Sequence, residues 1–238
     1  MSGLSAMIFA AGRGTRMRPL TAITPKPLIE VFGKAMIDHV FTRLDDAGVK
    51  RYVVNVHYLA DMIEVHVRRH APGAVTISDE RSGLLDTGGG LVKALPHLGD
   101  KPFIVANSDT FWLEGAFPTL RRVIDSFDPE KMDALLVLAP TVTAVGYDGR
   151  GDFQLETDGR LTRRREYTVA PFVYAGCAMM SPAALADPPG DVFSLNVIFD
   201  RLIAKGRLYG VRLDGLWLHV GTPRAIRDAE RAIRASAA

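Results

Sequence analysis

Short apolar runs alternate with longer amphipathic segments through the first 145 residues, and no other feature restricts the possible folds as strongly. Five of these runs have the composition of strands, at 6–12, 51–58, 74–80, 101–109 and 132–141. The segments between them place apolar residues at helical spacing. Strands separated by helices form right-handed crossovers, which build a parallel sheet. We therefore expect an α/β fold with a mostly parallel, Rossmann-like sheet flanked by helices.

The pattern changes after about residue 145. The chain then predicts a hairpin that turns at Asp158 and Gly159, followed by further strands and helices. The last helix is expected to begin with Thr222 as its N-cap. No repeat, low-complexity tract or linker interrupts the chain. We expect a single domain over 1–238, with a first part of about 1–145 and a smaller lobe of about 146–238.

Charge and cysteine content exclude several classes of protein. The formal net charge is only +2, yet residues 1–29 alone carry +4, so the basic character is local and points to a site and not to a nucleic-acid surface. The one cysteine, Cys177, excludes an intrachain disulfide and a cysteine-rich zinc site. No apolar run approaches the roughly 20 residues that span a bilayer, and the N-terminus is too short in its apolar part for a signal peptide. We expect a cytoplasmic, soluble protein that binds neither nucleic acid nor membranes.

The stretch FAAGRGTRMRPLTAITPKP, residues 9–27, holds three arginines, one lysine, three prolines and two glycines, and no acidic residue precedes Glu30. A glycine-rich loop after a strand is a general cradle for anions. The P-loop string is absent, and Met17 occupies the third glycine position of the dinucleotide fingerprint. The prolines exclude an α-helix here and stiffen the loop. Four cations without counter-charges in the loop suit a triphosphate, whereas the alternative is a solvated surface loop.

The same stretch, continued to LIEV, closely resembles the signature of the sugar-1-phosphate nucleotidyltransferases. The resemblance continues in LLDTGGGLVKAL, FIVANSD, GRGDF and LWLHVGTP, so that it spans almost the whole chain. Within this family the chain is most similar to the group that transfers uridylyl to N-acetylmuramate 1-phosphate, which shares the triple glycine and GRGDF.

The resemblance implies an enzyme that joins a sugar-1-phosphate to a nucleoside triphosphate and releases pyrophosphate, by in-line attack on the α-phosphorus. It implies Mg²⁺ as cofactor, with Mn²⁺ as the second choice, and a nucleotide-binding first part followed by a sugar-binding lobe. The expected substrates are UTP and N-acetylmuramate 1-phosphate, which would place the reaction in peptidoglycan recycling. Other nucleotides (dTTP, CTP or GTP), phosphocholine as acceptor, and a non-catalytic nucleotide-sugar-binding relative remain as alternatives. We expect a monomer or a weak dimer.

By the same resemblance, three residues carry the chemistry. Arg16 would hold the β- and γ-phosphates, Lys26 would reach the α-phosphate and the sugar phosphate, and Asp109 would bind the metal. Phosphate contact and solvation remain equal alternatives for Arg13 and Arg18. The expected nucleotide-binding set is Ala11, Gly12, Gly14, Thr15, Arg16, Lys26, Asp86, Thr87, Gly88, Gly89 and Asn107.

His219 departs from the family pattern, because many members carry an aspartate that binds metal at this place. An imidazole suits Mg²⁺ less well than a carboxylate does. His219 is therefore expected to bind metal directly or through water, or to leave the metal to Asp109 and phosphate oxygens; a purely hydrogen-bonding histidine is the alternative. The run 163–165 of three arginines is either solvated or binds an acidic substrate group. The expected sugar-binding residues are Asp152, Glu166, Gly176 and Asn196.

Overall fold

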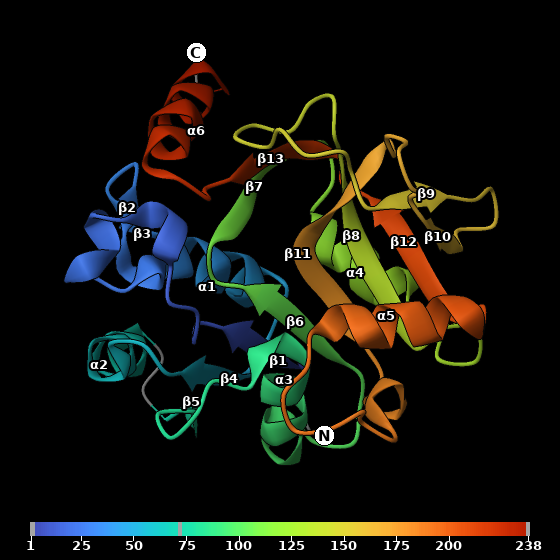
Figure 1. Ribbon diagram of the computed structural model, residues 1–238, viewed down its shortest axis with the longest axis horizontal. Helices are drawn as coiled ribbons and strands as arrows, with labels where there is room; N and C mark the ends of the chain where they lie inside the picture. The colour runs from blue at the N-terminus through green and yellow to red at the C-terminus, as the bar shows by residue number, and fades with distance from the viewer. Residues whose placement is uncertain (1–2, 71–72, 237–238) are drawn as a thin grey trace.

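The computed structural model describes residues 3–70 and 73–236. Within these residues a nine-stranded sheet forms the centre, in the order β10-β9-β11-β6-β1-β4-β5, with β8 paired to β11 and β12 paired to β8 (Figure 1). Its strands are β1 (Ser5–Phe9), β4 (Arg51–Val56), β5 (Val75–Asp79), β6 (Phe103–Asn107), β8 (Ala134–Pro140), β9 (Phe153–Leu155), β10 (Leu161–Arg163), β11 (Phe172–Met180) and β12 (Leu208–Arg212). The helices are α1 (Met36–Asp46), α2 (Ala60–His70), α3 (Asp86–Leu98), α4 (Thr119–Ser126), α5 (Leu195–Ala204) and α6 (Pro223–Ser236).

The expected parallel sheet is confirmed for β6, β1, β4 and β5, which all run in the same direction. Phe9 at the end of β1 lies beside Asn55 of β4 and Asn107 of β6. The carboxyl ends of these strands therefore meet at one edge, which is where parallel sheets bind ligands. The basic loop leaves from β1 at this edge.

Strand β11 comes from the part of the chain after residue 145 but lies between two strands of the first part, because it pairs antiparallel with both β6 and β8. Its residues alternate between two cores: Cys177 and Met179 pack on one face of the sheet, and Ala178 and Met180 pack on the other. Strands from both parts of the chain, from β1 at residue 5 to β12 at residue 212, therefore belong to one sheet. The hairpin predicted at Asp158 and Gly159 is present as β9 and β10.

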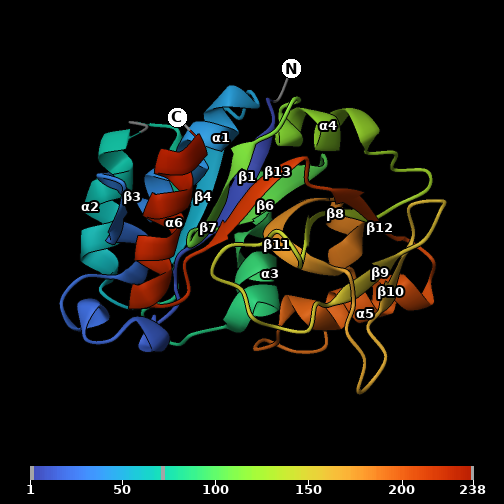
Figure 2. The same cartoon turned by 90° about the horizontal axis from the view of Figure 1, so that it is seen from above.

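Two short strand pairs lie outside this sheet. β2 (Glu30–Val31) pairs with β3 (Lys34–Ala35), and β7 (Thr110–Glu114) pairs with β13 (Gly215–His219). α6 lies beside β2 and β3 and contacts β13 (Figure 2). The β7–β13 pair matters for function because it brings the C-terminal part of the chain to the end of β6.

The basic loop contains three short 3₁₀ turns, Thr15–Met17, Leu20–Ala22 and Lys26–Leu28. The expectation that prolines exclude an α-helix is correct, although the turns themselves were not expected. Met17 is 1% exposed and packs with Phe111 and Val220. This apolar anchor fixes the segment 12–20, whose other residues are mostly exposed. Within the described ranges, none of the helices has both the length and the apolar run that a bilayer crossing needs.

Candidate active site

A cavity of about 480 Å³ lies at the carboxyl edge of the parallel strands. This volume is within the usual range for sites that bind small molecules. The residues that the sequence analysis assigned to nucleotide or metal and that line this cavity are Ala11, Gly12, Gly14, Thr15, Arg16, Lys26, Asp86, Thr87, Asn107 and Asp109. Three separate segments of the chain thus converge on one cavity, after β1, after β5 and after β6.

Lys26 and Asp109 form an ion pair in this cavity, with 2.5 Å between Lys26 Nζ and Asp109 Oδ2. Their side chains are 9% and 26% exposed. The expectation of four cations without counter-charges is therefore wrong for Lys26, because its counter-charge comes from the neighbouring strand and not from the loop. In the described part of the chain, the side chains of Arg13, Arg16 and Arg18 make no hydrogen bond or ion pair. Arg16 thus presents an unpaired guanidinium to the cavity.

Buried hydrogen bonds anchor the start of the basic loop. The Ala10 N–H donates to Asn55 Oδ1 at 2.8 Å. On the other side of β1, both the N–H and the hydroxyl of Ser108 donate to the Phe9 carbonyl, at 3.2 Å and 2.6 Å. The position of β1's last residues is therefore fixed by both neighbouring strands.

The two glycines of the loop differ in what requires them. Gly14 has φ +60°, and a Cβ there would lie 2.9 Å from Thr21 Cγ2 and 3.0 Å from Lys26 Cβ. Gly14 is thus demanded by the protein itself. Gly12 is outside the left-handed region, and a Cβ there would meet nothing within 4 Å. Nothing within the chain requires a glycine at position 12, so the space beside it is free for a ligand.

His219 lies close to the ion pair, because β13 pairs His219 with Thr110, the residue that follows Asp109. A Cβ on Gly221 would lie 2.8 Å from His219 Nε2 and 3.6 Å from the Arg16 guanidinium. Burial lowers the pKa of His219, the carboxylate of Asp109 opposes this effect, and the charges of Lys26 and Arg16 add to it. Burial and the two neighbouring cations thus favour the neutral imidazole, which is the form that can bind a metal.

Asp109, a member of this ion pair, and His219 beside it are two side chains that could hold a cation. Among residues 3–70 and 73–236, no three His, Cys, Asp or Glu side chains gather as a complete metal site would require. One carboxylate and one imidazole suit a divalent ion whose remaining ligands are phosphate oxygens and water. The residues present thus fit a cation that arrives together with a nucleotide.

The first two glycines of α3 do not line the cavity. The N–H groups of Gly88 and Gly89 donate to the Phe193 carbonyl at 2.9 Å and 3.2 Å. A Cβ on Gly88 would lie 2.3 Å from the Phe193 ring, and one on Gly89 would lie 2.0 Å from the Asp191 carbonyl oxygen. These glycines therefore admit the segment before α5, which packs directly on the start of α3. Their assignment to the nucleotide stays a prediction.

The four expected sugar-binding residues also lie outside the cavity lining. Asp152 Oδ2 accepts a hydrogen bond from the Tyr174 N–H at 3.0 Å, and Gly176 has φ +78° at an irregularity in β11. Asn196 accepts a hydrogen bond from Arg163, and Glu166 is exposed.

The first two arginines of the run 163–165 bind within the protein. Arg163 pairs with Asp200 at 2.6 Å, and Arg164 donates to the carbonyls of Gly151 and Thr168. Neither alternative considered for this run, solvation or an acidic substrate, included these internal partners.

Other residues of the cavity were not expected from the sequence. Leu84, Val192 and Gly221 line it, and Asp86 has the strained value φ +60° for a residue other than glycine. The strain at Asp86 has no signature in the sequence. Gly221, by contrast, lies two residues after His219 in the motif LWLHVGTP, and this motif could have pointed to it.

Comparisons with known proteins show which family the chain belongs to. The model of the nucleotidyl transferase family matches residues 5–147. The chain is 48% identical to an N-acetylmuramate alpha-1-phosphate uridylyltransferase of Caulobacter vibrioides, over 94% of this chain and 95% of the relative. It is 35% identical to a protein of the same name from Neisseria meningitidis serogroup B, over 95% of this chain and 97% of the relative.

Solved structures support the fold. HddC from Yersinia pseudotuberculosis, complexed with GMP-PN, matches with a TM-score of 0.75 and 23% identity over 97% of this chain and 99% of that one. A UDP-glucose pyrophosphorylase complexed with UDP-glucose matches with a TM-score of 0.77 and 15% identity over 98% and 99% of the two chains. A family match over more than half of the chain, together with two relatives above 30% identity along nearly all of it, shows that this chain belongs to the nucleotidyl transferase family.

Proposed function

We propose that this protein is a uridylyltransferase that joins N-acetylmuramate 1-phosphate to UTP and releases pyrophosphate. The observation that carries the proposal is the identity of 48% with a relative of that name over nearly the whole of both chains. The cavity supports it independently, because an unpaired arginine, a paired lysine and a carboxylate converge at the carboxyl edge of a parallel sheet. The proposal includes a cytoplasmic location, a role in peptidoglycan recycling, and a monomer or weak dimer.

The proposed reaction needs charge and positioning and no covalent intermediate on the protein. An oxygen of the sugar phosphate forms a bond to the α-phosphorus of UTP, while the bond from that phosphorus to the β-phosphate oxygen breaks and pyrophosphate leaves. Arg16 and the loop 11–14 would hold the β- and γ-phosphates. Lys26 would turn from Asp109 to the α-phosphate and the attacking phosphate, where its charge offsets the repulsion between two anions.

The proposed cofactor is Mg²⁺, with Mn²⁺ as a substitute. Asp109 would hold it together with phosphate oxygens, and His219 would bind it directly or through water. When bound, the ion would neutralise charge that builds on the departing pyrophosphate. For the sugar, the proposed contacts remain Asp152, Glu166, Gly176 and Asn196.

The decisive experiment measures pyrophosphate release from UTP, dTTP, CTP and GTP, each with N-acetylmuramate 1-phosphate, glucose 1-phosphate, mannose 1-phosphate and phosphocholine. We expect the highest kcat/KM for UTP with N-acetylmuramate 1-phosphate. Faster turnover with another pair would replace the substrate assignment but keep the reaction. No release with any pair would reject the enzyme and favour a nucleotide-sugar-binding protein.

A further inference from the structure

Glu80 is a carboxylic acid buried completely behind the cavity. It follows β5 directly and is 0% exposed. Within the described residues no lysine, arginine or histidine forms an ion pair with it. Burying a carboxyl group without a cation is costly, so its hydrogen bonds must account for its presence. It does not line the cavity and has no role in the proposed reaction.

Both carboxyl oxygens of Glu80 accept hydrogen bonds from the chain. Asn55 Nδ2 donates to Oε1 at 2.7 Å, and the Leu85 N–H donates to Oε2 at 3.1 Å. The other end of the Asn55 amide accepts the Ala10 N–H at 2.8 Å. A Cβ on Gly90 would lie 2.6 Å from Glu80 Oε1, so the third glycine of the triplet makes room for this carboxyl group.

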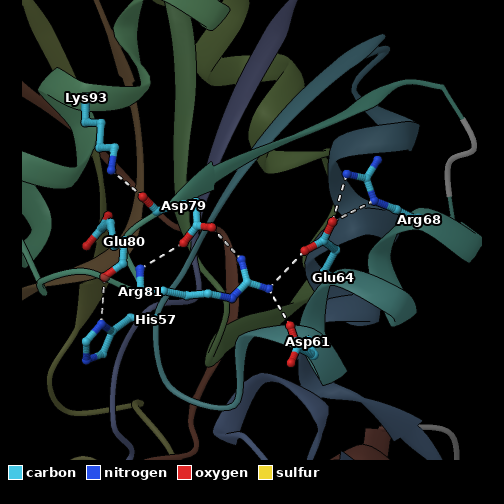
Figure 3. Close-up of polar contacts among 8 residues, drawn as sticks. All are labelled: His57, Asp61, Glu64, Arg68, Asp79, Glu80, Arg81 and Lys93. Carbon is cyan, nitrogen blue, oxygen red and sulfur yellow. Dashed lines mark hydrogen bonds and ion pairs between the residues drawn. The ribbon is translucent and has the colours of Figure 1, made fainter.

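The two donors lead to two different sides of the cavity. Through Asn55, Glu80 fixes Ala10, which begins the loop 10–14. Through its own second oxygen, it fixes Leu85, which precedes Asp86 and Thr87. One side chain therefore sets the distance between the loop 10–14 and the segment 84–87. The backbone of Glu80 is itself held. Its N–H donates to the Val56 carbonyl, and its own carbonyl accepts from the His57 imidazole (Figure 3).

The hydrogen-bond count explains why a carboxylate is needed. Asn55 Nδ2–H and Leu85 N–H both require an acceptor, and a carboxylate offers two acceptor oxygens and no donor. A glutamine offers one acceptor oxygen and an NH₂ group, so one of the two N–H groups would face another donor. If the Asn55 amide rotated to relieve this, the Ala10 N–H would lose its partner.

We propose that Glu80 is a positioning residue that holds the loop 10–14 and the segment 84–87 in register around the nucleotide. The expected change in the KM for UTP rests on the proposed function. The expected change in amide exchange rests on the hydrogen bonds alone. Glu80 acts through Asn55 and Leu85 and touches no substrate.

The test compares E80Q with the double variant N55D/E80Q. In E80Q we expect the KM for UTP to rise about tenfold, the scale of one unsatisfied buried donor, with a much smaller change in kcat. Hydrogen exchange of the Ala10 or Leu85 amide, followed by NMR without nucleotide, should become faster.

The double variant should restore what E80Q loses. In N55D/E80Q the carboxylate introduced at position 55 accepts from the Ala10 N–H and from the side-chain amide introduced at position 80. The oxygen of that amide accepts from the Leu85 N–H. All donors are paired again, so amide protection should return and the KM should fall well below that of E80Q.

Arg81 offers a matched control in the next position. It binds Asp61 and Asp79 at 2.6 Å and Glu64 at 3.1 Å, on the outer surface, and Figure 3 shows its side chain extending toward α2. R81Q removes the ion pairs of the neighbouring residue without touching the buried hydrogen bonds of Glu80. We expect R81Q to leave the KM for UTP and the two amide exchange rates unchanged.

Two results would overturn the proposal. One is an E80Q enzyme with unchanged KM and unchanged amide exchange, and the other is a double variant no better than E80Q. An E80Q enzyme with a lowered Tm, whose KM and amide exchange measured well below that Tm equal those of the wild type, is an instance of the first result and also contradicts a positioning role. If the wild-type protein turned over no triphosphate at all, the proposed function would fail. The amide exchange of the three variants would still decide the role of Glu80.

Discussion

Lys26 and Asp109 stand 83 residues apart in the sequence and hold each other at 2.5 Å in the cavity. In the proposed reaction each residue would exchange this partner for another. Lys26 would bind a phosphate in place of Asp109, and Asp109 would bind a cation in place of Lys26. The pair thus keeps a largely buried ammonium satisfied before the substrates arrive. It also means that each charge influences how the other binds.

We expect Lys26→Ala to lower kcat/KM for pyrophosphate release at least a hundredfold, about 2.7 kcal/mol of transition-state stabilisation. The variant should also lose stability, by about 1–2 kcal/mol, because it leaves the partly buried Asp109 without its partner. Steady-state kinetics and urea unfolding measure the two effects. R13A, which removes an exposed arginine without a partner, should leave the unfolding free energy unchanged. A loss of less than tenfold in rate would remove Lys26 from the reaction.

Asp109→Asn should raise the Mg²⁺ concentration needed for half-maximal activity, because one ligand charge disappears while the shape is retained. A titration of activity against Mg²⁺ and Mn²⁺ measures this. The same titration on H219D, which adds a carboxylate beside Asp109, should move in the opposite direction. Identical curves for the wild type and D109N would show that Asp109 is not a metal ligand, and its ion pair with Lys26 would be its remaining role.

Gly12→Ala should weaken UTP binding without changing stability, because a Cβ at position 12 meets nothing in the chain yet projects where a ligand would approach. Gly14→Ala should instead destabilise the protein, since the added Cβ meets Thr21 and Lys26 at a positive φ. Calorimetric titration with UTP and thermal unfolding separate the two effects. Unchanged UTP affinity in G12A would mean that the loop does not touch the nucleotide.

His39 should make stability depend on pH. Burial lowers its pKa, against the opposing effect of the hydrogen bond to the Val31 carbonyl, and its ring stacks on Phe111 with centroids 4.3 Å apart. An unfolded histidine titrates near pH 6.5, so the unfolded state binds more protons below that value. The stabilisation is therefore complete above pH 6.5 and is lost as pH falls through the lower folded pKa.

The variant H39Q keeps a donor for Val31 but does not titrate. We expect the unfolding free energy of the wild type to fall more steeply than that of H39Q between pH 7 and pH 5. Denaturant unfolding at several pH values measures both slopes, and parallel profiles would assign the pH dependence to other groups.

The fold was largely predictable because its parallel strands are continuous apolar runs and its helices have strong periodicity. β6 and α1 are clear examples. β7 was missed, since its short TFWLE sequence directly follows the polar end of β6. Its pairing with β13 is what brings His219 beside Asp109, so the resemblance suggested their shared role but the residues alone could not.

The site was predictable where the residue type sets the backbone conformation. It was less predictable where the role of a residue depends on contacts with residues far away in the sequence. The glycines of the loop signalled close approach, but only the structure separates Gly14, which the chain requires, from Gly12, which it does not. Glu80 looked like an ordinary strand end. Its role depends on Asn55 and Leu85, and no local pattern reveals that both point at one carboxyl group.

The position of β11 between β6 and β8 has a consequence for synthesis on the ribosome. β6 and β8 are both completed before β11 emerges, so the apolar β6 must wait with one edge unpaired while the chain from Asn107 to Phe172 is added. An unpaired apolar edge is a template for association with other chains. Chains that stall or are truncated between residues 110 and 170 should therefore be far more prone to aggregate than the finished protein, in which β11 seals both edges at once.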